Sequence, residues 1–112
     1  VFMHSFKNAI HEKLAKKIIE AHAPNLNVCL SSIVSPEIGE YERTSTSVAN
    51  AYVQPIFKSY VTSLVKGLKK IGITNDLFLM LSDGGIVHQK TAIEFPIRLV
   101  QSGPAGGAQA AT

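Results

Sequence analysis

The stretch of residues 44–71 constrains the fold most, because it predicts one helix of unusual length. Apolar side chains recur there every four residues, at Val48, Tyr52, Ile56, Tyr60 and Leu64, with a second apolar row beside them. A stripe this wide predicts burial along most of the helix. Pro55 lies inside the stripe and removes one backbone N–H, so we expect a kink or a break there. Gly72 is expected to end the helix in the left-handed conformation.

Several shorter helices and strands complete the expected order of elements. Residues 9–22 form an amphipathic pattern with Asn8 as the predicted N-cap, and residues 89–94 form a short helical segment. A brief helix is expected to begin at Ser35-Pro36 and to be interrupted by Gly39. Short apolar runs predict strands at residues 28–34, 77–82 and 97–101. Strands that alternate with helices predict an α/β fold with neighbouring parallel strands.

Length and composition exclude several classes of protein. The 112 residues amount to one domain or part of one, and 46% are hydrophobic. A net charge of +3 is too small to imply a nucleic acid or an anionic membrane as partner. The single cysteine, Cys29, excludes a disulfide framework and is expected to be a buried, inert thiol. The sequence indicates a cytoplasmic chain, and the residue at position 1, Val1, suggests a piece of a longer one.

Two polar stretches in the first half of the chain are candidates for chemistry. His11-Glu12 near the start of the first helix is either a surface pair or a polar pair aimed at a cleft. Residues 40–46 form the densest polar stretch, in which Arg43 pairs with a carboxylate or with an anionic ligand. The hydroxyl groups in that stretch either cap the long helix or bind substrate oxygens.

Two glycine-containing segments stand in the second half. Residues 82–85 predict a turn after a strand, where Asp83 either completes the turn or accepts a proton, holds water or orients a metal. Residues 102–107 predict a tight turn that leads into a helix of very small residues. This second segment matches neither nucleotide-binding glycine motif, so anion binding and close helix packing both remain open.

Taken in order, six stretches resemble the hydantoinase/oxoprolinase family. They are His4-Ser5-Phe6, NAIHE at 8–12, SPEIGEYERTST at 35–46, VANAY at 48–52, SDGG at 82–85 and QSGPAGG at 101–107. The family includes ATP-dependent hydantoinases, 5-oxoprolinases, and subunits of acetone and acetophenone carboxylases. One departure is Ala9, where the family more often has proline, and it loosens the predicted helix start.

The resemblance implies an ATPase of the actin and sugar-kinase type, with ATP and Mg²⁺ between two ribonuclease-H-like lobes. The phosphate loops of such proteins, of the form D-x-G-G-T, do not occur in this sequence. Residues 1–112 therefore resemble a single segment of the amino-terminal lobe, ending in the helix that crosses between the lobes. The implied reaction phosphorylates the oxygen of a cyclic amide, and water then opens the ring. The implied partners are the remainder of the parent chain and a second subunit of the hydantoinase B type.

Residue chemistry assigns candidate positions within this scheme, and the resemblance itself does not. Near the substrate or the lobe interface we expect seven residues: His11, Glu12, Tyr41, Glu42, Arg43, Thr44 and Thr46. We expect five residues to line the nucleotide cleft or to form its hinge: Asp83, Gly84, Gly103, Ala105 and Gly106. No metal ligand set is expected, and the segment alone is expected to hold no ATP. Two alternatives stay open, a ketone carboxylase subunit of the same family and an α/β binding module without catalysis.

Overall fold

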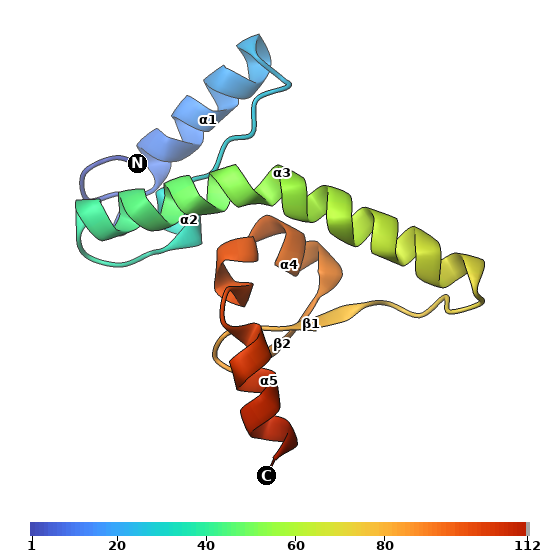
Figure 1. The fold of residues 1–112 in the computed structure, drawn as a ribbon. Coiled ribbons are helices and arrows are strands. Elements are labelled where there is room, and N and C mark those ends of the chain that lie inside the picture. The colour runs from blue at the N-terminus through green and yellow to red at the C-terminus, as the bar shows by residue number, and fades with distance from the viewer. Residues whose placement is uncertain (112) are drawn as a thin grey trace. The chain divides into compact units, whose positions relative to one another are not determined.

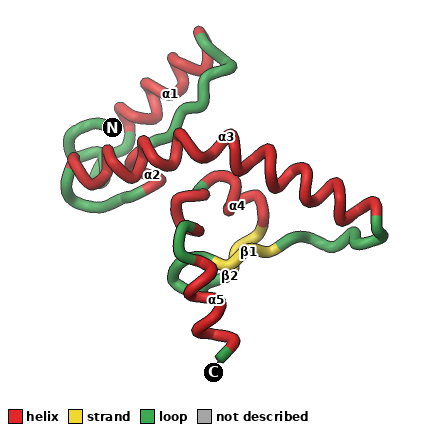
Figure 2. Tube along the Cα trace, viewed as in Figure 1, coloured by secondary structure: helices red, strands yellow, loops and turns green. Residues whose placement is uncertain are grey.

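The computed structural model describes residues 1–111 as two compact units, one formed by residues 1–52 and the other by the residues from 53 onward (Figure 1). Figure 2 shows that helices dominate both units. The elements are α1 (Ile10–His22), α2 (Ser31–Val34), α3 (Glu40–Lys70), β1 (Phe78–Met80), β2 (Ile86–His88), α4 (Gln89–Glu94), the 3₁₀ helix η1 (Pro96–Leu99) and α5 (Ser102–Ala110). Among these described residues, no helix is both long enough and apolar enough to span a membrane.

The helix predicted at residues 9–22 is confirmed. α1 begins one residue later than expected, with Ala9 at the N-cap position. Asn8 still contributes, because its Oδ1 accepts a hydrogen bond of 3.1 Å from the N–H of Ile10. An N–H group in the first turn has no partner within its own helix, and Asn8 supplies one from outside it.

The long helix is confirmed, although it starts four residues before the expected Thr44. α3 begins at Glu40, directly after Gly39, whose φ of +107° turns the chain into the helix. The helix then runs through Pro55 without interruption. It ends as predicted at Gly72, where φ is +90°. The N–H of Gly72 donates to Lys69 and that of Ile73 to Leu68, which is the paired closure of a Schellman motif.

The predicted burial of α3 is wrong for one of its two apolar rows. Val48, Tyr52, Ile56 and Tyr60 are each between 61 and 75% exposed, and we call them the exposed apolar row. Val61 of the adjoining row is buried. Periodicity identifies side chains that share one face of a helix, but it does not show that another segment covers that face.

The strand predicted at residues 28–34 is also wrong. Residues 28–30 carry no regular structure, and the last four residues form the short helix α2, in which Ser31 and Val34 are buried. A carboxylate from α1, that of Glu12, accepts the N–H of Ser32 in the first turn. This hydrogen bond stabilises the first turn of α2 from another helix, and the β propensity of residues 28–34 contains no information about it. The brief helix expected from Ser35 does not form, and residues 35–39 connect α2 to α3.

The second unit contains a hairpin in place of the expected parallel strands. β1 lies within the predicted strand 77–82 but pairs antiparallel with β2, with Leu79 opposite Val87. The predicted turn at residues 82–85 is confirmed, and Gly84 has a φ of +86° there. A continuous apolar run suits either kind of strand pairing, and the short turn permits the antiparallel one. No parallel strand pair occurs in residues 1–111, so that part of the predicted fold class is wrong.

Three separate helices, α4, η1 and α5, follow the hairpin. α4 confirms the helix predicted at residues 89–94, whereas the strand predicted at 97–101 is the 3₁₀ helix η1. Pro96 opens η1, and the guanidinium of Arg98 lies 4.6 Å from the centre of the Phe95 ring. The tight turn predicted at 102–107 is already part of α5, which begins at Ser102.

Candidate functional site

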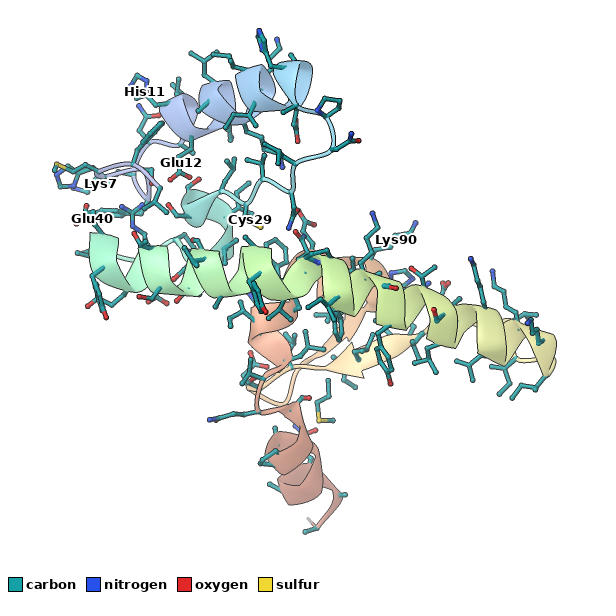
Figure 3. The ribbon with its side chains drawn as sticks, turned by 45° about the horizontal axis from the view of Figure 1, so that its top comes forward. Lys7, His11, Glu12, Cys29, Glu40 and Lys90 are labelled. Atoms are coloured by element: carbon teal, nitrogen blue, oxygen red, sulfur yellow. The ribbon has the colours of Figure 1, made fainter. Side chains whose placement is uncertain are left out.

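The first unit contains a cluster of four polar residues, each no more than 2% exposed. They are Ser5, Glu12, Ser31 and Arg43, and we call them the polar cluster. Each comes from a different segment: the loop before α1, then α1, α2 and α3. Figure 3 shows Glu12 on the side of α1 that faces α2, whereas the neighbouring His11 lies away from it. Buried polar groups are costly unless they are hydrogen-bonded, so the contacts within the cluster decide its stability.

Glu12 accepts hydrogen bonds at both carboxylate oxygens. Its Oε1 accepts from the hydroxyls of Ser5 at 2.7 Å and Ser31 at 2.5 Å, and from the N–H of Phe2 at 3.0 Å. Its Oε2 accepts from the N–H of Ser32 at 2.9 Å. The carboxylate therefore fastens α1 to α2 and to the loop that precedes α1.

These contacts set the protonation state of Glu12. Burial raises the pKa of the carboxyl group, but the hydrogen bonds from Ser31, Ser32 and Ser5 outweigh it and lower the pKa to about 2. The side chain is consequently ionised at neutral pH. A carboxylate held in this state serves as a fixed negative charge and is poorly suited to exchange a proton during a reaction.

Arg43 provides the matching positive charge. Its Nη1 donates to the hydroxyls of Ser5 and, at 3.2 Å, Ser31. Its Nη2 donates to the carbonyl oxygen of Phe2 at 2.8 Å. The guanidinium also lies 5.6 Å from the centre of the Phe6 ring. Each serine hydroxyl thus donates to Glu12 and accepts from Arg43, so the two opposite charges are joined through hydroxyl groups.

Glu40 extends the polar cluster toward its exposed edge. Its Oε1 accepts the N–H of His4 at 3.3 Å and lies 3.5 Å from Nη2 of Arg43. The pKa of Glu40 is lowered, first by the hydrogen bond from His4 and also by the positive charge of Arg43. Glu40 therefore ties the first turn of α3 to the loop before α1.

The other residues expected near the substrate lie outside this cluster. His11, Tyr41, Glu42 and Thr44 are exposed, and Tyr41 is 81% exposed. The hydroxyl of Thr44 donates to the carbonyl oxygen of Glu40 in the same helix, at 2.6 Å. Thr46 is half-buried. Of the seven expected residues, the structure therefore brings Glu12 and Arg43 together, and it leaves four on the surface.

Three of the five residues expected at the nucleotide cleft lie where the hairpin meets α5. Asp83 Oδ1 accepts the N–H of Gly85 at 2.8 Å, as in an ordinary turn. The carbonyl oxygen of Gly84 accepts from Gln109 Nε2 of α5 at 3.1 Å. A Cβ added at Gly106 would lie 3.1 Å from the sulfur of Met80, so α5 approaches β1 closely there.

The two remaining residues of that set, Gly103 and Ala105, lie in the first half of α5. A Cβ added at Gly103 would meet no atom within 4 Å, and Ala105 is half-buried. Within residues 1–111, no group of three or more His, Cys, Asp or Glu side chains is placed to hold a metal ion. Oδ1 of Asp83 accepts a hydrogen bond within its own turn. Among the five residues expected at the nucleotide cleft, Asp83 alone has a charged side chain.

Comparison with known proteins decides the family. Residues 43–112 match the hydantoinase/oxoprolinase family. The chain belongs to that family. The resemblance seen in the sequence motifs is therefore confirmed. The matched residues include Arg43 of the polar cluster and the whole second unit.

Individual relatives of this member of the hydantoinase/oxoprolinase family align with nearly the whole chain. An uncharacterized protein of Methanocaldococcus jannaschii is 45% identical over 96% of this chain. The caprolactamase subunit alpha of Pseudomonas jessenii is 33% identical over 97%, and the 5-oxoprolinase of Saccharomyces cerevisiae is 38% identical over 95%. The chain spans 16%, 16% and 8% of the lengths of these three relatives. No solved structure matches it significantly.

Sequence reasoning missed the two serines that complete the polar cluster of this family member. Ser5 stands out in the sequence only as part of a motif, and Ser31 lies in the segment that local propensity predicts as a strand. One signal was present, because the Ser31-Ser32 pair interrupts an otherwise apolar run and a buried hydroxyl needs a partner. That signal does not identify the partner, since Glu12 is distant in the sequence.

Proposed function

We propose that the full-length natural protein hydrolyses a cyclic amide at the expense of ATP. The observation that carries this proposal is the similarity, over almost the whole chain, to two enzymes whose names contain those of cyclic amides, caprolactamase and 5-oxoprolinase. The proposed reaction phosphorylates the amide oxygen, after which water opens the ring. Because phosphate loops of the form D-x-G-G-T do not occur in residues 1–112, we assign the binding of ATP and Mg²⁺ to other parts of the full-length protein.

We further propose that this chain is a segment of the amino-terminal lobe of an ATPase of the actin and sugar-kinase type. In this proposal α5 is the helix that crosses between lobes. Its small residues, and the close approach of Gly106 to Met80, support that role, because a crossing helix has to pack tightly. A cytoplasmic location and a second subunit of the hydantoinase B type belong to the same proposal. The name of one relative, a subunit alpha, agrees with a multi-subunit enzyme.

Six of the seven residues expected near the substrate divide into two groups under this proposal. Glu12 and Arg43 are positioning residues, because they are buried and bind each other through serine hydroxyls. They hold α1, α2 and the start of α3 in a fixed arrangement. His11, Tyr41, Glu42 and Thr44 are exposed, and we propose that they face the substrate or the remainder of the protein.

The test is phosphate release from ATP by the full-length natural protein in the presence of Mg²⁺. ε-Caprolactam, 5-oxoproline and hydantoin are offered separately, and the ring-opened acid is measured by mass spectrometry. We expect one of them to stimulate phosphate release and to be converted in equal amount. Stimulation by a ketone with bicarbonate, and by none of the three amides, would support the carboxylase alternative. Phosphate release that no compound changes would favour a binding module.

A further inference from the structure

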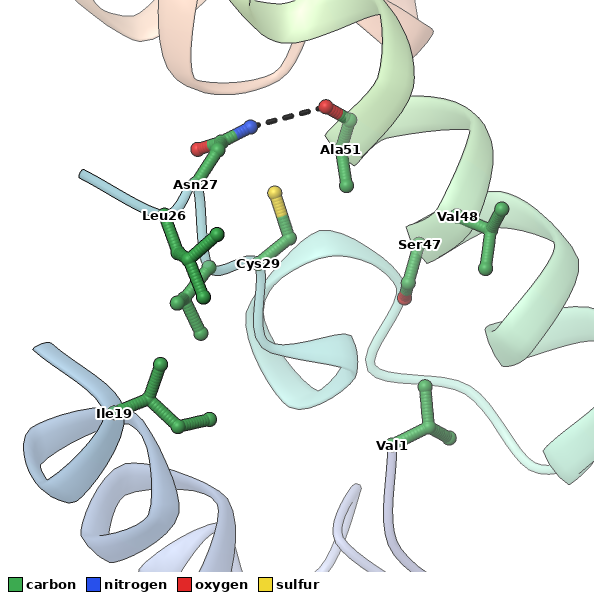
Figure 4. Close-up of a pocket in the computed structure, with 9 residues that line it drawn as sticks. Val1, Ile19, Leu26, Asn27, Cys29, Ser47, Val48 and Ala51 are labelled. Atoms are coloured by element: carbon green, nitrogen blue, oxygen red, sulfur yellow. Dashed lines mark hydrogen bonds between the residues drawn. The ribbon is translucent and has the colours of Figure 1, made fainter. Parts of the chain in front are cut away.

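The helix α1 contacts the rest of the first unit through its polar side. The buried residue of α1 is Glu12, which makes the hydrogen bonds of the polar cluster. Ile19 lies on the same side of the helix and lines a hollow beside Cys29 (Figure 4). An amphipathic helix ordinarily buries its apolar stripe and leaves its charged residues in water. In α1 an acidic residue is buried instead.

The apolar stripe of α1 lies on the other side of the helix and is open to water. Ile10, Leu14 and Ile18 are 63, 53 and 52% exposed, and we call them the outer row. They stand four residues apart and therefore share one face of the helix. At about 3.6 residues per turn, this face lies opposite Glu12. More than half of each residue in the outer row is thus left uncovered by the described residues.

The first unit buries little apolar surface of its own. Among its described residues, the buried hydrophobic ones are Leu30 and Val34, whereas the polar cluster alone contributes four buried polar residues. Removing apolar surface from water is the main favourable contribution to the stability of a folded protein. A segment that covers the outer row would therefore supply apolar burial that residues 1–52 do not provide for themselves.

The size of the outer row favours an occupant from the same polypeptide over a separate molecule. A stable interface between two proteins has about 20 to 30 residues on each side, and the outer row has three. Segments of one polypeptide can pack through so small a face, because their contact does not cost the translational and rotational freedom of a second molecule. The chain spans 16%, 16% and 8% of the lengths of three relatives, so most of each relative lies outside the aligned region.

We propose that the outer row of α1 packs against an apolar segment of the same polypeptide, outside residues 1–112, in the full-length natural protein. α1 then lies between two partners, with the polar cluster on the side of Glu12 and the apolar segment on the side of the outer row. Lys13 and Lys17 are exposed and remain in water at the edge of this contact. The inference does not depend on the proposed reaction, because aliphatic side chains take no part in catalysis.

Cysteine substitution measures whether the outer row is covered. Leu14→Cys and the control Lys13→Cys are introduced separately into the full-length natural protein, which is treated briefly with N-ethylmaleimide. Cleavage after glutamate then releases residues 13–20, which contain no natural cysteine, for mass spectrometry. Alkylation at position 14 should be roughly tenfold slower than at position 13, because a covered thiol reacts only during local opening. Equal rates in the two folded variants would overturn the proposal.

A second variant and a change of conditions complete the test. Ile18→Cys probes the same row one turn further along α1, and it decides the question if Leu14→Cys impairs folding. Its alkylation should also be slow, and dilution of the protein should leave it slow. Protection that disappears on dilution would assign the outer row to a second copy of the protein. Protection that requires an added subunit or anionic phospholipid vesicles would assign it to a separate partner, and either result would refute an occupant from the same polypeptide.

Discussion

The side-chain amide of Asn27 donates a hydrogen bond of 3.0 Å to the carbonyl oxygen of Ala51. In a regular helix this carbonyl would accept from the N–H four residues later, which is the position of Pro55. Proline has no N–H, so a side chain from outside the helix supplies the missing donor. This contact helps to explain why α3 continues through Pro55, where the sequence predicts a kink or a break.

Because Asn27 replaces the N–H that Pro55 lacks, the cost of substituting Asn27 should depend on whether residue 55 is proline. Asn27→Ala should lower the free energy of unfolding by about 1 kcal/mol, because the carbonyl of Ala51 loses its donor. In a Pro55→Ala background the same change should cost less, since the restored N–H at position 55 bonds to that carbonyl. Urea denaturation of the four proteins gives the coupling energy. An equal cost in both backgrounds would show that the Asn27 contact does not replace the missing bond.

The pKa of Glu12 predicts a loss of stability in acid. Its pKa is about 2 in the folded chain, against a usual value of 4.5, so folding favours the ionised form. The stabilisation is fully present above pH 4.5 and is lost as the pH falls toward 2, by about 3 kcal/mol in all. Glu12→Gln should flatten the plot of unfolding free energy against pH in this interval. Glu37→Gln, at an exposed position between α2 and α3, is the control and should leave the slope as it is.

Arg43 and Glu12 should behave as one unit. Arg43→Met leaves the Glu12 carboxylate buried without its positive partner, and we expect the free energy of unfolding to fall by about 3–5 kcal/mol. Adding Glu12→Gln to that variant should cost less than Glu12→Gln costs in the unaltered chain. Arg43→Lys should not restore stability, because an ammonium group cannot reproduce the two-nitrogen contacts with Ser5, Ser31 and Phe2. Strictly additive effects in denaturation experiments would contradict the proposed link through the serines.

The contact between α5 and β1 predicts that substitution by valine destabilises the fold more at Gly106 than at the adjacent Gly107. Gly106→Val should destabilise the second unit by about 1–3 kcal/mol, because the new side chain meets the sulfur of Met80. Gly107→Val is the matched control, since a Cβ there meets no atom within 4 Å. Hydrogen exchange of the amides of β1 and α5 in the two variants measures the difference. Similar exchange rates would show that Gly106 has room for a larger residue.

The parts of the fold that depend on local periodicity could be predicted from the sequence. α1 and α3 have long repeats of apolar residues, and Gly72 marks the end of α3 with the correct backbone conformation. α2 could not be predicted, because its apolar sequence resembles a strand and its stabilising partner, Glu12, belongs to another helix. The parallel pairing predicted for β1 is wrong, since its apolar run fits parallel and antiparallel neighbours equally well.

The candidate site shows the same limit. The sequence identifies Glu12 and Arg43 as candidate site residues, but their connection depends on Ser5 and Ser31, which the tertiary structure brings between them. The sequence predicts a carboxylate or an anionic ligand beside Arg43, but it does not predict the complete burial of Arg43. Which side chains reach the surface depends on packing, and that information is absent from a spacing pattern.

The exposed apolar row of α3 matters for any work with the isolated chain. Four large side chains that water contacts on one helical face favour self-association, which increases with protein concentration. Denaturation midpoints recorded on concentrated samples would then combine dissociation with unfolding. Dilution series, checked by light scattering, are therefore the appropriate basis for the stability comparisons above.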